Sequence, residues 1–144
     1  DHFMGLLSKR DLLTFGDNYV LFELSFMQEP PILQEAIFEM QSAGYKPILA
    51  HPERYLYYHN SFEVYENLHK QGVFLQLNLN SLAGQYSPHV KRTSEKLIES
   101  QLISFLGSDC HHLGHIALSE QVLSNPYLKD LISSDNLLNH TLIQ

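Results

Sequence analysis

The segment FLGSDCHH, residues 105–112, places an aspartate, a cysteine and two histidines directly after an apolar run. In an extended chain, residues i and i+2 project to the same side, so Asp109 and His111 can present a carboxylate and an imidazole to one cavity. Such a pair can chelate a metal ion. Alternatively, Asp109 caps a following helix and His111 is simply exposed. The segment alone leaves both interpretations open.

Cys110 raises a second possibility, a thiolate nucleophile. Cysteine-dependent phosphatases carry an arginine six positions after the cysteine, whereas the sixth residue after Cys110 is Ile116. We therefore expect Cys110 to be a small, semi-buried residue without a catalytic role. As the only cysteine in the chain, it also excludes an internal disulfide and a cysteine-rich structural zinc site.

Two more polar residues accompany apolar runs. The alternation in YVLFELSF places Glu23 mid-strand between apolar neighbours, and a carboxylate buried there would need a metal or a cation as its partner. His51 ends the run PILA. A solvent-facing glutamate and a structural histidine are the alternatives. If both residues join Asp109 and His111, the set holds two carboxylates and two imidazoles, a mixture that suits Zn, Mn or Fe.

Arg54 follows His51 by three residues in HPER, which puts a permanent positive charge beside the candidate metal ligands. A guanidinium group matches two oxygens of a phosphate, although Arg54 could instead pair with Glu53 or another carboxylate. The next four residues, YLYY at 55–58, could line an entrance for a ring-bearing substrate or cover the rim of the fold.

The elements that must position these residues are strands alternating with helices. Four runs rich in β-branched and aromatic residues predict strands, at 18–26, 46–51, 72–80 and 102–109. Helical spacing predicts helices between them, with Gly44 and Gly72 at two helix ends and Ser61 as an N-cap. A further helix is predicted at about 88–100, and two or three short ones after residue 109, one restarting at Pro126. This order predicts an α/β fold with a parallel sheet.

Polar residues recur where the predicted strands end. Glu23, His51, Asn78 and Asp109 are separated by 28, 27 and 31 residues, about one strand–helix unit each. In parallel sheets and barrels, reactive groups gather at the carboxyl ends of the strands. We therefore expect all four side chains to face one mouth.

Length and composition restrict the class of protein. The chain has 144 residues and 44% hydrophobic content, which predicts one domain with a buried core. Its formal net charge of -7, without a basic patch, argues against nucleic-acid binding. The sequence lacks an apolar stretch of roughly 20 residues, so no membrane span is predicted, and a cytoplasmic location is expected.

The motifs PILAHPERY, VLFEL and GSDCHH resemble those of the bacterial tyrosine phosphatases of capsular and exopolysaccharide synthesis, members of the polymerase and histidinol phosphatase (PHP) superfamily. The resemblance runs nearly end to end. It implies a distorted (β/α)7 barrel with a centre of two or three metal ions, usually manganese, that hydrolyses phosphotyrosine on a partner tyrosine kinase. Here Glu23 matches the bridging carboxylate, His51 and Asp109 match ligands of different metals, His111 matches a third-site ligand, and Arg54 matches the phosphate-binding arginine.

The chain also departs from that family pattern. Cys110 stands where alanine is usual and His112 where asparagine is usual. Residues 1–22 do not supply the His-x-His strand with which family members open. We therefore expect residues 1–144 to be the carboxyl-terminal part of a single PHP-type barrel domain, about its last four βα units. Alone it would be inactive, and an unpaired strand edge could favour a homo-oligomer.

The favoured function is a metal-dependent phosphomonoester hydrolase in which Arg54 and the metals neutralise developing charge and no covalent enzyme intermediate forms. One alternative is a phosphatase of small molecules such as histidinol phosphate. A different class of function is a non-catalytic interaction module that binds a kinase tail or a sister subunit. Comparing activity on phosphotyrosine peptides with activity on small phosphates separates the two kinds of phosphatase. Retained metal without turnover would indicate the interaction module.

Overall fold

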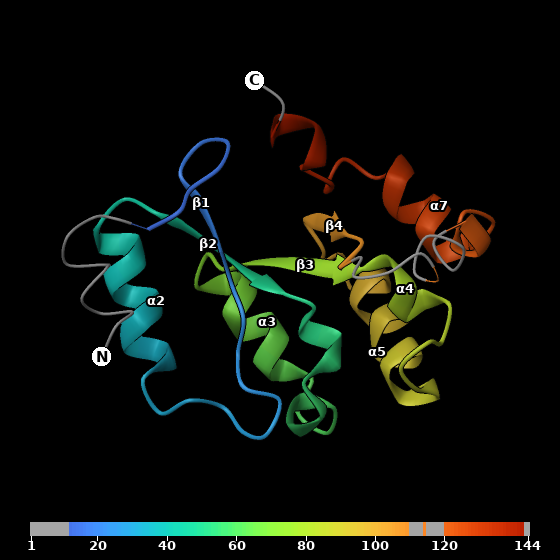
Figure 1. The fold of residues 1–144 in the computed structure, drawn as a ribbon, viewed down its shortest axis with the longest axis horizontal. Helices are drawn as coiled ribbons and strands as arrows, with labels where there is room; N and C mark the ends of the chain where they lie inside the picture. Colours follow the sequence, from blue (N-terminus) through green and yellow to red (C-terminus); the bar gives the residue numbers. More distant parts are fainter. Residues whose placement is uncertain (1–11, 110–113, 115–119, 143–144) are drawn as a thin grey trace.

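A computed structural model of the protein describes residues 12–109, 114 and 120–142. Four parallel strands form one sheet in the order β1-β2-β3-β4 (Figure 1). The strands are β1 (Tyr19–Phe22), β2 (Lys46–Ala50), β3 (Phe74–Asn78) and β4 (Phe105–Gly107). Strands that follow one another in sequence are neighbours in the sheet, so each connection crosses back over it. The predicted α/β fold with a parallel sheet is confirmed.

The connections are largely helical, as the apolar spacing predicts. The α-helices are α2 (Leu33–Ser42), α3 (Glu63–Lys70), α4 (Leu79–Leu82), α5 (Pro88–Glu99) and α7 (Pro126–Ser133). Short 3-10 helices are η1 (Pro52–Arg54), η2 (Leu56–Tyr58) and η3 (Asn139–Leu142). The first turns of α5 and α7 combine a proline with a capping side chain, because Ser87 Oγ accepts from Val90 N and Asn125 Oδ1 from Tyr127 N.

Two predicted helix ends are correct, whereas one predicted helix start is not. Gly44 and Gly72 each follow a helix C-cap with φ of +88° and +86°, a left-handed conformation that favours glycine. The predicted N-cap role of Ser61 is wrong. Helix α3 starts at Glu63, and its N-cap residue Phe62 has helical φ and ψ and no capping side chain. The chain already turns through η2, since Ser61 N donates to the Tyr58 carbonyl, so no extended capping residue precedes the helix.

The core lies on both faces of the two central strands. Leu49 of β2 and Leu75 and Leu77 of β3 are completely buried. Helix α2 adds a buried face at helical spacing, comprising Leu33, Ala36, Ile37 and Met40. Burial of each such leucine contributes roughly 1.5 to 3 kcal/mol. The carboxyl ends of β2 and β3 are therefore anchored, and residues that follow them have fixed positions.

Strand β1 is shorter than predicted and ends at Phe22, before Glu23. It pairs along one side with β2, from Tyr19 opposite Lys46 to Phe22 opposite Leu49. No helix in the described ranges combines the length and the apolar character needed to cross a membrane.

Candidate active site

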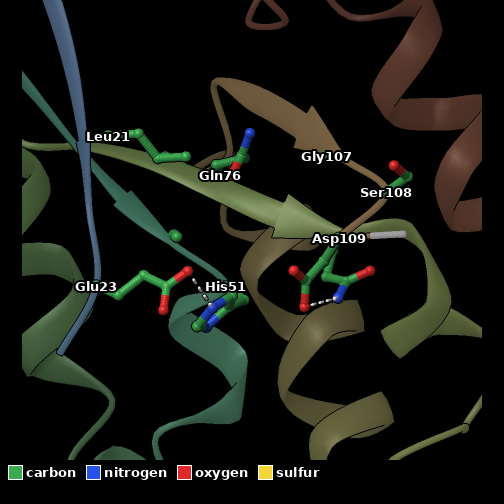
Figure 2. A pocket seen from close by; sticks show the side chains of 9 residues that line it. Leu21, Glu23, His51, Gln76, Gly107, Ser108 and Asp109 are labelled. Carbon is green, nitrogen blue, oxygen red and sulfur yellow. Dashed lines mark hydrogen bonds and ion pairs between the residues drawn. The ribbon is translucent and has the colours of Figure 1, made fainter. Parts of the chain in front are cut away.

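A pocket of about 190 Å³ opens at the carboxyl ends of the strands (Figure 2). Its lining includes all four strand-end residues singled out in the sequence, Glu23, His51, Asn78 and Asp109. Leu21, Ala50, Gln76, Gly107 and Ser108 complete it. The structure therefore brings three of the four candidate metal ligands to one cavity. The fourth candidate, His111, lies outside the described residues, as do Cys110 and His112.

Glu23 and His51 form one wall of this pocket. Glu23 Oε1 lies 3.4 Å from His51 Nε2, and Figure 2 shows the two side chains pointing toward each other. The expectation that Glu23 is a buried mid-strand carboxylate is wrong, since 60% of its side-chain surface is exposed. The reason is that β1 ends one residue earlier, which places Glu23 in the segment after the strand.

His51 is buried and held in a particular state. Burial, followed by the nearby positive charge of Arg54, lowers the pKa of His51, so its ring is neutral at neutral pH. Its Nδ1 atom is buried without a hydrogen-bond partner in the described part of the chain. A neutral imidazole is the form that binds metal ions, and Nε2 is the ring nitrogen that lies beside Glu23.

Two pocket residues have strained backbones. His51 has φ of +36° and Asp109 has φ of +44°, a left-handed conformation that costs residues with a Cβ atom of the order of 1 to 3 kcal/mol. Both residues directly follow a strand or lie close to its end, where pairing stops. Strain of this kind clusters where a fold must aim a side chain, which favours a functional role for both positions.

Asp109 lies on the opposite wall, and Arg54 contacts it from beside the pocket. Arg54 Nη1 donates to Asp109 Oδ2 over 3.1 Å, across 55 residues of sequence. The amide of Asn78 lies 3.5 Å from the same carboxylate oxygen and donates to Tyr86 Oη over 3.0 Å. Of the alternatives for Arg54, pairing with a carboxylate therefore occurs, and that carboxylate is Asp109. The contact also puts the guanidinium beside the pocket, where a phosphate would meet it.

Two aromatic rings lie close to the guanidinium of Arg54. Its Cζ atom lies 4.8 Å from the ring centre of Phe26 and 4.2 Å from that of Tyr86. These are cation–π distances, and the planar guanidinium is the side chain that stacks best in this way. Neither ring was singled out in the sequence, because Phe26 and Tyr86 both lie in irregular segments whose course depends on tertiary contacts.

The aromatic run 55–58 does not line the entrance. Tyr55 and Tyr58 are buried, and the hydroxyl groups of the run contact the segment after β1 instead. Leu24 N donates to Tyr55 Oη over 2.9 Å, Tyr57 Oη donates to the Ser25 carbonyl over 2.8 Å, and Tyr58 Oη donates to the Glu29 carboxylate. These three contacts fix the segment that carries Glu23 and Phe26.

Glu53 connects the turn after β2 to the start of α4. Its side chain is completely buried, and its Oε1 accepts from Ser81 Oγ over 2.6 Å and from Asn78 N over 3.1 Å. Its Oε2 has no hydrogen-bond partner among the described residues. Burial raises the pKa of Glu53 to about 7, although these hydrogen bonds oppose the rise. Sequence reasoning gave Glu53 no role beyond a possible partner for Arg54.

The buried Glu53 predicts a pH-dependent stability. Its folded-state pKa is above the ordinary value of 4.5, so the folded protein binds this proton more tightly than the unfolded chain does. The stabilisation is complete below about pH 4.5 and is lost as the pH rises through about 7, a change of roughly 3 kcal/mol in the free energy of unfolding. Urea unfolding from pH 5 to 8 in EDTA measures it. Glu53→Gln should flatten the profile, whereas the exposed Glu35→Gln should not, and equal slopes would contradict the assignment.

The donors of the described pocket match a metal centre in type but supply only part of one. In the ranges 12–109 and 120–142, no three His, Cys, Asp or Glu side chains gather closely enough to hold a single ion. Glu23 with neutral His51 gives one donor pair, and Asp109 gives a donor on the other wall. Carboxylate and imidazole donors suit Mn, Zn and Fe. These residues fit a centre that other donors complete.

Comparisons with known proteins place this chain in a family. Residues 1–120 match the family described as capsular polysaccharide synthesis, CpsB/CapC. The chain is 34% identical over 108 residues to the tyrosine-protein phosphatase YwqE of Bacillus subtilis (strain 168), covering 74% of this chain and 42% of that protein. It is 32% identical over 95 residues to the putative tyrosine-protein phosphatase CapC of Staphylococcus aureus, covering 66% of this chain and 37% of that protein.

The fold agrees with the same relatives. The chain matches a structure from work on YwqE from Bacillus subtilis and CpsB from Streptococcus pneumoniae, described as unique metal-dependent tyrosine phosphatases. The TM-score is 0.75 at 31% identity, over 89% of this chain and 54% of the solved chain. The chain spans about two fifths of the length of the curated relatives it matches. The resemblance found in the sequence is confirmed: the chain belongs to the CpsB/CapC family of capsular polysaccharide synthesis.

Proposed function

We propose that the protein acts as a metal-dependent phosphomonoester hydrolase on phosphotyrosine in proteins. The observation that carries the proposal is the pocket at the strand ends, which Glu23 and His51 line on one side and Asp109, paired with Arg54, lines on the other. Metal donors beside a guanidinium suit metal-assisted hydrolysis of a phosphate ester. Membership in a family whose relatives are named tyrosine phosphatases supports the choice of substrate.

The proposal extends to the fold around the pocket. The four parallel βα units would be part of a distorted (β/α)7 barrel of the PHP type, and residues 1–144 would form the carboxyl-terminal part of that single domain. The match to just over half of the solved chain supports this assignment. The carboxyl ends of all strands in such a barrel face one mouth, where further metal donors would meet Glu23, His51 and Asp109.

The metal donors are assigned to Glu23, His51, Asp109 and His111, and the metal to manganese, with zinc and iron as the alternatives. A divalent ion bound there would stabilise charge on phosphoryl oxygens and make a bound water more acidic. His51 contributes a neutral ring without first losing a proton. Glu23, largely exposed, can reach the ion by a side-chain rotation.

Arg54 would bind the phosphoryl group. Its guanidinium can donate to two phosphoryl oxygens at once, and its charge stabilises the transition state as negative charge develops. The hydrogen bond to Asp109 and the Tyr86 ring hold it beside the pocket. The natural partner would be a phosphotyrosine protein such as the tail of a tyrosine kinase, in the cytoplasm, in the regulation of capsule or exopolysaccharide synthesis. A homo-oligomer is the quaternary state we propose.

The test uses the full-length product, meaning the protein encoded by the whole reading frame in which this chain lies. With Mn²⁺ it should release phosphate from a phosphotyrosine peptide and lose this activity in EDTA. Histidinol phosphate is the comparison substrate. Faster hydrolysis of histidinol phosphate would favour a small-molecule phosphatase, and Mn²⁺ binding without any turnover would favour a non-catalytic interaction module.

Cys110 separates this mechanism from a thiol mechanism. Because no covalent enzyme intermediate is proposed, Cys110→Ala in the full-length product should retain most of the phosphotyrosine activity, within about threefold. Asp109→Ala, one residue away, should abolish it. Initial rates on a phosphotyrosine peptide measure both. Equal losses in the two variants would contradict the metal mechanism.

A further inference from the structure

Phe26 is a large apolar side chain that is partly exposed to solvent. About 49% of its surface is exposed, although it lies beside the candidate active site. Its ring stacks on His51, with ring centres 5.5 Å apart and planes at 18°, and it faces the Arg54 guanidinium at 4.8 Å. Phe26 therefore contacts a candidate metal ligand and the candidate phosphate-binding arginine with one part of its surface and leaves the other part open.

The segment that carries Phe26 is held in place. The two residues directly before it form hydrogen bonds with the tyrosines of η2 and its N-cap, from Leu24 N to Tyr55 Oη and from Tyr57 Oη to the Ser25 carbonyl. The Tyr55 ring also lies 5.5 Å from the Phe26 ring. An exposed ring that is fixed by its neighbours loses little freedom when a ligand packs against it, so it is suited to recognition.

We propose that Phe26 is a specificity-determining residue that packs against the aromatic ring of the phosphate ester and so selects aryl over alkyl phosphates. This inference rests on the proposed function, since it takes Arg54 as the phosphate site. In an aryl phosphate, the ring is one ester oxygen away from phosphorus. The Phe26 ring centre is 4.8 Å from Arg54 Cζ. A phosphoryl group bound to this guanidinium can therefore bring the ring of the ester to the roughly 4.5 to 7 Å from Phe26 at which aromatic pairs interact.

Exposure favours Phe26 over Tyr55, Tyr58 and Tyr86 as the ring that meets a ligand. Tyr55 and Tyr58 are buried and cannot meet a ligand. Tyr86 is partly buried, and its hydroxyl accepts from the Asn78 amide, so its ring serves to hold Arg54. An alkyl phosphate such as phosphoserine has no ring to place on Phe26, and the contact would add nothing to its binding.

The competing explanation is that Phe26 only positions Arg54 or His51. In that case its loss would weaken every phosphate ligand equally, because all of them use the same guanidinium. Ring recognition predicts a loss confined to ligands with a ring. Comparing two ligands that differ only in the ring therefore separates the two roles.

The experiment measures binding of phenylphosphonate and methylphosphonate, which cannot be hydrolysed, to the Mn²⁺-loaded full-length product by calorimetry. The original protein should bind phenylphosphonate about tenfold more tightly than methylphosphonate. Phe26→Ala should remove this preference and leave methylphosphonate affinity within twofold, whereas Phe26→Tyr should keep it. Phe38→Ala, an exposed phenylalanine of α2, is the matched control and should change neither affinity.

The outcomes are distinct from those that test the hydrolase proposal. No preference for phenylphosphonate in the original protein, an equal loss of both ligands in Phe26→Ala, or no loss in that variant would each overturn the inference. None of these depends on turnover. Absence of phosphotyrosine hydrolysis, with the ring preference and its loss in Phe26→Ala intact, would overturn the hydrolase proposal and leave the ring-binding role of Phe26 standing.

Discussion

Replacing Arg54 by alanine is expected to lower kcat/KM for a phosphotyrosine peptide by about 10² to 10³ in the full-length product, the size of effect seen when one preorganised charge-stabilising donor is removed. Removal of the Arg54 side chain should not weaken Mn²⁺ binding. Its positive charge lies beside Asp109, to which it donates a hydrogen bond, and repels a cation bound nearby. Steady-state kinetics and a Mn²⁺ titration of the same preparation measure the two quantities.

Arg54→Lys is the sharper variant. Lysine keeps the positive charge but cannot donate to two oxygens in one plane or stack between Phe26 and Tyr86. We expect kcat/KM of Arg54→Lys to exceed that of Arg54→Ala by no more than about tenfold. Arg92→Ala is the matched control, since this arginine of α5 is outside the pocket, with an Nη2 atom 2.9 Å from His89 Nδ1. Wild-type activity in Arg54→Lys would show that charge alone suffices and that the stacked geometry is unimportant.

Much of the fold and the position of the pocket follow from sequence pattern. Apolar runs bounded by turn residues define β2 and β3 well, because most residues of these two central strands are buried. His51, which follows β2, and Asn78, the last residue of β3, are therefore correctly predicted to lie at the carboxyl ends of these strands. Asp109 meets them across a gap of 31 residues for the same reason: parallel strands bring their carboxyl ends together.

The features that sequence reasoning missed depend on irregular segments. Alternation in YVLFELSF cannot show that pairing stops at Phe22, so the burial of Glu23 was predicted wrongly. The tyrosine run adopts short 3-10 turns, in which side chains do not follow the period of a strand or an α-helix, and Tyr55 and Tyr58 face inward. The sandwich of Arg54 by Phe26 and Tyr86 joins loops 60 residues apart and leaves no local pattern to read.

Replacing a proposed metal donor is expected to have the opposite pattern from Arg54→Ala, because Mn²⁺ affinity should fall. Asp109→Asn and His51→Ala in the full-length product should each lower Mn²⁺ affinity at least about 100-fold, since second-sphere changes alone typically cost 10- to 100-fold. Asparagine keeps the size of Asp109 but removes the charge that attracts a cation. His51→Ala removes a neutral nitrogen donor that the fold holds ready. Phosphotyrosine hydrolysis should fall with metal affinity and recover in part at high Mn²⁺.

Electron paramagnetic resonance of free aqueous Mn²⁺ measures this affinity directly, without relying on turnover. Asp17→Asn is the matched control for Asp109, because Asp17 is an exposed aspartate that pairs with Lys46 far from the pocket. His69→Ala, on the exposed end of α3, is the control for His51. Near-ultraviolet circular dichroism shows whether each variant keeps its packing. If Asp109→Asn and His51→Ala remain folded and bind Mn²⁺ as tightly as Asp17→Asn, then the pocket at the strand ends is not the metal centre, and Arg54 would act on phosphate without it.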